Sequence, residues 1–233
     1  MRDVGETLDR QGFVPLAPVG VGAPGFDYLV RRGWSPAHVA KAAERFWLRY
    51  DPRERCVVFP HIACGSVVHW TSRTIGPTTL RRYRSVDKYR PEPPNDQCQR
   101  FTVYDADAVC AGGDTLFICE GPLDAISVWL AGDGDVVVAT ALFGAWASPI
   151  QLALLRGVRP LYQRVFVMLD ADAIGQGQEL TGKLDAGVID VGQEHDDPGA
   201  MPIDELRRLA TFAVTSDQRR IAWPLARREL LCR

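Results

Sequence analysis

Residues 116–125, LFICEGPLDA, place a short apolar run directly before an acidic residue, Glu120, and residues 165–172, VFVMLDAD, repeat this arrangement. A short apolar run bounded by turn residues is typical of a strand that is buried on both faces of a sheet. A helical pattern follows each run, at residues 122–132 and 177–184. Because buried strands that alternate with helices form parallel sheets, the sequence predicts an α/β fold for this part of the chain.

Two further strand and helix pairs continue the alternation. The segments DVVVATAL (135–142) and GVIDVG (187–192) have strand patterns, and SPIQLALLRGV (148–158) and PIDELRRLA (202–210) have helical ones. All strands of a parallel sheet point in the same direction, so their carboxyl ends meet at one edge, where ligands usually bind. Side chains that follow these strands are therefore the first candidates for a functional site.

Carboxylates gather at this predicted edge, because an acidic residue follows three of the four strands. The five candidates are Glu120, Asp170, Asp172, Asp196 and Asp197. Mutual repulsion makes such a group costly unless cations neutralise it. Hard oxygen ligands favour Mg²⁺ or Mn²⁺, which typically act on phosphate groups. The sequence therefore predicts a magnesium or manganese site at this edge.

Each acid also has an ordinary structural interpretation. Asp124 fits a first-turn helix acid that the helix dipole favours. Asp196 fits a turn cap, and Asp170 and Asp172, followed by Gly175, fit a simple turn. The combination of these segments in this order is more specific than any one of them.

The 233-residue chain has a net charge of −2, but the charge is unevenly divided. Residues 1–100 carry 16 basic and 10 acidic side chains, and residues 101–233 carry 11 basic and 19 acidic ones. This asymmetry indicates contact with nucleic acid or phosphate through the basic half. The six cysteines include no CxxC pair, so no zinc is expected, and the sequence shows neither a signal peptide nor a membrane-spanning apolar run. We therefore expect a cytoplasmic protein with no membrane contact.

The N-terminal half has a different pattern. CVVFPHI (56–62) and SVVHWTSR (66–73) predict a strand pair, and Ser35 is a helix cap candidate. Residues 76–100, rich in proline and arginine, predict a long connection. The predicted division is an N-terminal arm (1–24), a smaller basic α+β subdomain (25–110), the parallel-sheet domain (111–210) and a C-terminal helical tail (211–233).

Three acidic segments carry a resemblance to a known family. LFICEGPLDAISVW, VFVMLDADAIGQ and EHDDP resemble the three acidic motifs of the TOPRIM fold in the RNA-polymerase core of bacterial and phage DnaG-type DNA primases. ATALFGAW resembles the small-residue loop between the first two motifs, and RCVVFPHIACGSVVHWTSR resembles upstream strands of the family. Residues 25–210 are covered by this resemblance.

The resemblance implies metal-dependent synthesis of primers from NTPs on single-stranded DNA. It implies that Asp170, Asp172 and Asp197, with Asp196 as a further candidate, hold Mg²⁺ or Mn²⁺. It also implies that Glu120 and Asp124 are catalytic, with Glu120 as a general acid or base and Asp124 orienting it. The structural glycines would be Gly121, Gly144 and Gly175. The residues that would contact the triphosphate and the template are Arg73, Arg81, Arg82, Arg84 and Lys88.

The chain also departs from the family pattern. No Cys/His zinc domain precedes residue 25, and Gly199 stands where the third motif has a second aspartate. We therefore expect a separate helicase or zinc-domain protein as partner. The expected source of the chain is a phage or another mobile element. Two alternatives stay open: a TOPRIM nuclease, and a non-catalytic primase-like module that binds nucleic acid.

Some aromatic residues and histidines have weaker functional signals. Trp70 and Tyr83 are of a type that stacks on bases, but a core position is favoured for Trp70. His61, His69 and His195 lack the spacing of metal ligands, so packed or solvated positions are expected for them.

Overall fold

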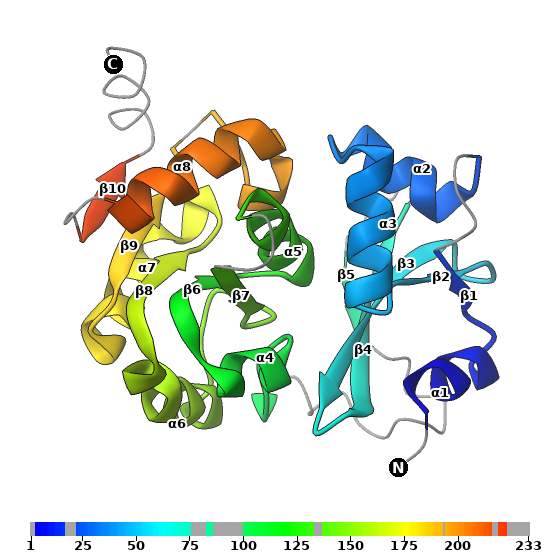
Figure 1. The fold of residues 1–233 in the computed structure, drawn as a ribbon, viewed down its shortest axis with the longest axis horizontal. Helices are drawn as coiled ribbons and strands as arrows, with labels where there is room; N and C mark the ends of the chain where they lie inside the picture. The colour runs from blue at the N-terminus through cyan, green and yellow to red at the C-terminus, as the bar shows by residue number, and fades with distance from the viewer. Residues whose placement is uncertain are drawn as a thin grey trace. The chain divides into compact units, whose positions relative to one another are not determined.

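The computed structural model describes residues 3–16, 22–75, 83–85, 100–132, 137–192, 194–215 and 219–222. The chain divides into two compact units, Met1–Gln99 and Arg100–Arg233, here called unit 1 and unit 2 (Figure 1). Each unit has one sheet of its own, so each is considered by itself. Among the described residues, no helix has the length and apolar character needed to cross a bilayer.

Unit 1 is built on an antiparallel sheet in which the strands follow chain order. The predicted strand pair is confirmed, with Cys64 and Gly65 forming the turn between its strands. The predicted helix cap is also confirmed, since the Ser35 hydroxyl accepts a hydrogen bond from the His38 backbone. The elements are α1 (Val4–Arg10), β1 (Val14–Pro15), α2 (Pro24–Arg31), α3 (Pro36–Arg45), β2 (Arg49–Asp51), β3 (Cys56–Ala63), β4 (Ser66–Thr74) and β5 (Tyr83–Ser85).

The first residues of the chain belong to the core of unit 1. Leu8 on α1 and Phe13 are buried against Val58 and Trp70, and the Phe13 and Trp70 rings meet edge to face with centroids 5.2 Å apart. The expectation of a separate arm over residues 1–24 is therefore wrong for residues 3–16, because burial of these apolar side chains holds the segment on the sheet. The preference for Trp70 as a core residue is confirmed.

Two histidines are buried side by side in the middle of the same sheet. His61 on β3 faces His69 on β4, with ring centroids 4.9 Å apart, and both are fully buried. The Nε2 atom of His61 lies 2.8 Å from the Thr71 hydroxyl. Burial, followed by the neighbouring His69, lowers the pKa of His61 well below its usual value. Its surroundings therefore favour the neutral form of His61.

Unit 2 contains the predicted parallel sheet, with strand order β10-β9-β8-β6-β7 and every pair parallel. The α/β prediction is confirmed (Figure 1). The strands are β6 (Gly113–Cys119), β7 (Val137–Ala141), β8 (Tyr162–Met168), β9 (Gly187–Asp190) and β10 (Arg220–Ala222). The α-helices are α4 (Ala106–Ala111), α5 (Pro122–Ala131), α6 (Pro149–Val158), α7 (Ile174–Leu184) and α8 (Ile203–Thr215).

The predicted helical tail is wrong in part. Helix α8 continues to Thr215, but residues 220–222 form β10 at the edge of the sheet, beside β9. Ile221 is buried in this strand, and the Arg219 carbonyl accepts a hydrogen bond from the Val188 backbone. One buried isoleucine and these backbone bonds pair the segment with the sheet.

Candidate active site

The sheet register of unit 2 brings the acidic segments to one edge. Cys119, the last residue of β6, pairs with Met168, the last residue of β8. Glu120 and Asp170 therefore leave neighbouring strands at the same edge. Strand β9 lies on the other side of β8, so the segment that follows β9 leaves the sheet at this edge as well.

Glu120 is the electrostatic centre of the group. The side chain is half-buried, and burial raises its pKa to about 7, with smaller contributions from the negative charges of Asp124, Asp172 and Asp197. Burial also raises the pKa of the adjacent Cys119 thiol, with further contributions from the charges of Asp124 and Asp170. The structure thus brings at least four of the predicted acids into electrostatic contact with the end of β6. A carboxyl group with a pKa near 7 exchanges protons readily at neutral pH.

Asp124 has a defined structural task. It lies in the first turn of α5, is 4% exposed, and accepts a hydrogen bond from the Gly121 backbone at 3.0 Å. Its other carboxylate oxygen accepts from the Gly199 backbone, also at 3.0 Å. Asp124 therefore connects the turn after β6 to the segment after β9. This geometry supports a positioning role and leaves its predicted catalytic role a prediction.

The segment after β8 is connected to the segment after β9. The Ala171 backbone donates a hydrogen bond to the Asp196 carbonyl at 3.0 Å, and the Ala173 backbone donates to the Asp170 carbonyl at 2.9 Å. This tight turn leaves Asp172 exposed to solvent and Asp170 half-buried. Two acidic segments are thereby fixed to each other by backbone geometry.

The two aspartates after β9 lie in different environments. Asp197 is 8% exposed, precedes a short 3₁₀ turn (Pro198–Ala200), and is one of the charges that raise the pKa of Glu120. Asp196 is exposed and contributes its carbonyl oxygen to the contact with Ala171. Of the two candidates, Asp197 is the one whose charge contributes to the raised pKa of Glu120.

The three predicted structural glycines differ in whether backbone conformation or packing requires a glycine at that position. Gly144 has a φ of +154° and donates from its backbone to the Glu120 carbonyl at 3.2 Å, so a conformation that favours glycine supports the turn after β6. Gly121 caps α5 in an extended conformation and bonds to Asp124. At Gly175 a side chain would meet open space, so packing sets no requirement for glycine there.

The predicted basic contacts all belong to unit 1, and most cannot be placed. Arg73 on β4 is 6% exposed, and such burial favours a structural role over a phosphate contact. Arg84 lies on β5, where the structure describes the backbone alone. Arg81, Arg82 and Lys88 lie outside the described residues.

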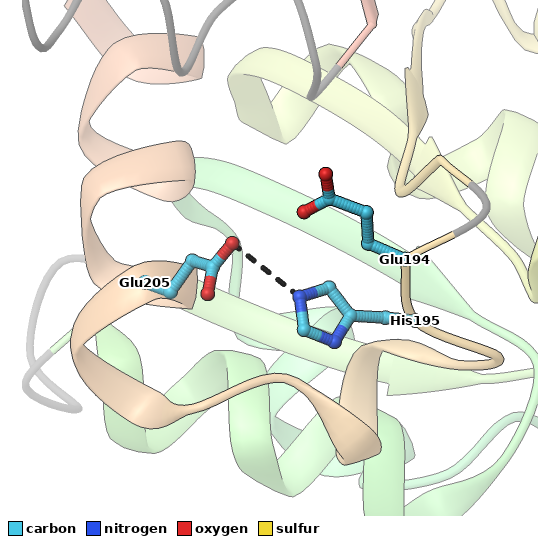
Figure 2. A group of neighbouring side chains, drawn as sticks. All are labelled: Glu194, His195 and Glu205. Atoms are coloured by element: carbon cyan, nitrogen blue, oxygen red, sulfur yellow. Dashed lines mark hydrogen bonds and ion pairs between the residues drawn. The ribbon is translucent and has the colours of Figure 1, made fainter.

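The acidic edge has suitable donors for a hard divalent cation, because Asp170, Asp172 and Asp197 offer only oxygen atoms. These three do not meet at one point, however. Within the described ranges, the one group of three or more such side chains whose ligand atoms all lie within 4.8 Å of one another is Glu194, His195 and Glu205 (Figure 2). Sequence reasoning missed this group, since ten residues separate Glu205 from His195 and no motif links them.

Comparison with known proteins finds similarity only in structure. No protein-family model and no curated protein matches this chain. A DnaG primase catalytic domain bound to single-stranded DNA is 17% identical, with a TM-score of 0.59 over 85% of this chain and 74% of the other. The zinc-binding and RNA polymerase domains of Aquifex aeolicus primase give 17% identity and a TM-score of 0.59, over 90% of this chain and 60% of that one.

Two further structures give the same result. The RNA polymerase domain of Mycobacterium tuberculosis primase DnaG is 15% identical, with a TM-score of 0.59 over 90% of this chain and 81% of the other. Primase domains of bacteriophage T7, bound to an RNA/DNA hybrid and interacting with a DNA polymerase, are 16% identical, with a TM-score of 0.53 over 81% and 90%. At such identities the similarity concerns the fold. The chain therefore has the α/β fold of the catalytic domains of DnaG-type primases.

Proposed function

We propose that this chain is a primase-like nucleotidyltransferase that joins NTPs on a single-stranded DNA template with the help of Mg²⁺ or Mn²⁺. The observation that carries this proposal is the gathering of acids around Glu120 at the carboxyl edge of the parallel sheet. The shared fold with primase catalytic domains supports it, as does the resemblance of the acidic segments to TOPRIM motifs. A parallel sheet commonly places its ligand at this edge.

Each acid has a separate role in the proposal. Asp170, Asp172 and Asp197 would hold one or two divalent cations, which when bound would supply charge stabilisation for the attacking hydroxyl and the leaving pyrophosphate. Glu120 would accept the proton of the primer 3′-hydroxyl at its carboxylate, because its pKa is raised to about 7. Asp124 would keep the turns that carry Glu120 and Asp197 at a fixed separation through its two backbone hydrogen bonds.

The proposed partners follow from the relatives. The similar primase domains are described with single-stranded DNA, with an RNA/DNA hybrid and with a polymerase. We expect the same class of nucleic acid here, together with a replication protein that carries a helicase or zinc domain. The basic segment with Arg81, Arg82, Arg84 and Lys88 is the expected template contact, as basic grooves follow the backbone of single strands.

A primer-extension assay tests the proposal. Purified full-length chain, an annealed primer, NTPs and Mn²⁺ should give extended products, and Asp170→Asn with Asp172→Asn should remove them. Glu179→Gln is the matched control, since Glu179 is an exposed acid of unit 2 that pairs with Lys183. Cleavage of labelled DNA without extension would instead support the nuclease alternative. The absence of both extension and cleavage would support the alternative of a non-catalytic binding module.

A further inference from the structure

A second group of ligand-type side chains lies beside the acidic edge. Glu194 and His195 belong to the segment after β9, and Glu205 lies in the first turn of α8. Their ligand atoms all lie within 4.8 Å of one another. Figure 2 shows the Nε2 side of the His195 ring and the carboxylates of Glu194 and Glu205 bordering a common space. The three side chains thus meet across two separate elements.

The spacing inside the group fits metal coordination. The Nε2 atom of His195 lies 3.3 Å from Oε1 of Glu205, which is longer than the usual range for an N–H···O hydrogen bond. Two ligand atoms at zinc-ligand distances in a tetrahedral arrangement are about 3.4 Å apart. His195 and Glu205 have side chains that are 17% and 18% exposed, whereas Glu194 is exposed and leaves a path to solvent.

We propose that Glu194, His195 and Glu205 bind one divalent ion of the zinc class, separate from the Mg²⁺ or Mn²⁺ of the acidic edge. One imidazole with two carboxylates forms a three-ligand zinc set that leaves a fourth position for water. Imidazole suits Zn²⁺, whereas sites for Mg²⁺ consist of oxygen atoms. The absence of zinc expected from the sequence depended on cysteine spacing, which does not apply to a set of this kind.

The position of the group indicates what the ion would stabilise. The segment that begins with Glu194 and His195 continues into Asp197 and into Gly199, which bonds to Asp124. An ion shared with Glu205 would fasten this segment to α8, which packs against α5. The ion would therefore hold one side of the acidic edge in place without contacting the substrate.

Binding of Zn²⁺, and of Co²⁺ as a visible probe, tests the proposal on the full chain after all thiols that react in the folded protein are blocked, the exposed Cys64 and Cys110 among them. We expect one equivalent of Zn²⁺ by calorimetry and the visible absorption typical of four-coordinate Co²⁺. His195→Asn and Glu205→Gln should each weaken binding at least tenfold. If either variant does not fold, Glu194→Gln replaces it as the test of binding, because Glu194 is exposed and its substitution should not disturb the core.

Two comparison variants separate this site from the acidic edge. Asp170→Asn with Asp172→Asn should bind Zn²⁺ as wild type does, even where it has lost all nucleotide incorporation, and so should Glu179→Gln. Zn²⁺ binding that survives in His195→Asn, Glu205→Gln and Glu194→Gln would overturn the proposal. Loss of Zn²⁺ binding in Asp170→Asn with Asp172→Asn would also overturn it. If wild type binds no Zn²⁺, the proposal is wrong and His195 and Glu205 form only a hydrogen bond.

Discussion

The titratable groups of the two units lie at different points along their strands. In unit 1, His61 and His69 face each other in the middle of two antiparallel strands, where the sheet surrounds them. In unit 2, Glu120 and Asp170 follow the last residues of two parallel strands. A group in mid-strand is fixed by packing and has no access to a ligand, whereas a group just past a strand end can turn toward one. The comparison separates a structural pair from a candidate site.

The same comparison predicts opposite responses to pH. The folded state lowers the pKa of His61 and raises that of Glu120 to about 7, so both groups favour their neutral forms. The unfolded state takes up a proton at His61 that the folded state excludes, so acid destabilises unit 1. The folded state holds a proton on Glu120 that the unfolded state releases, so raising the pH from about 4.5 to about 7 destabilises unit 2.

The largest effect is expected from Glu120→Gln. If Glu120 transfers the proton, primer extension should fall by about 10² to 10⁴, the usual contribution of general acid–base catalysis. In EDTA the same variant should unfold at higher denaturant than wild type at pH 8, and the difference should shrink as the pH falls from about 7 toward 4.5. Glu179→Gln should change neither quantity. Full activity in Glu120→Gln would show that Glu120 does not transfer the proton.

A smaller effect is expected from Asp124→Ala. Loss of two buried hydrogen bonds to a carboxylate should lower the free energy of unfolding by about 3 kcal/mol, measured by denaturant titration. The pKa of Glu120, followed by NMR in EDTA, should also fall, because Asp124 contributes to its rise. Asp107→Asn is the matched control, an exposed first-turn acid on α4. Should Asp124→Ala cost no more than this control, Asp124 does not hold the two turns together.

The smallest effect concerns the histidine pair. Below about pH 6.5 the proton that the folded state excludes from His61 should cost unit 1 about 1.4 kcal/mol of unfolding free energy per pH unit. His61→Gln should reduce this slope while leaving the slope due to Glu120 unchanged. The measurement is the free energy of unfolding between pH 5 and 8 for both proteins. Equal slopes in wild type and variant would show that His61 is not the group that titrates.

The sequence predicted what depends on local pattern. Alternating strands and helices gave the parallel sheet of unit 2, and acids at strand ends gave the position of Glu120 and Asp170. It missed β10, because three residues with one buried isoleucine are too short to show a pattern. It also missed the burial of Leu8, which depends on strands some fifty residues away in the chain.

Tertiary contacts that join separate segments were the other gap. The bond from the Gly199 backbone to Asp124 joins residues 75 positions apart, and no spacing rule predicts it. Glu205 meets His195 only because α8 returns beside the segment after β9. Motifs locate acids along the chain, but the side chains that hold those acids in place come from the fold.

The most direct test of the acidic edge is the effect of Mg²⁺ on the melting temperatures of wild type and of Asp170→Asn with Asp172→Asn. Mg²⁺ is the suitable ion, because the group with His195 favours zinc-class metals. In EDTA the variant should melt above wild type, since two repelling charges are gone. Mg²⁺ should then raise the melting temperature of wild type and leave that of the variant unchanged. At a hundredfold excess over the dissociation constant, the expected gain in wild-type stability is about 2.7 kcal/mol. An equal Mg²⁺ shift in both proteins, or none in wild type, would contradict a cation site at the end of β6 and β8.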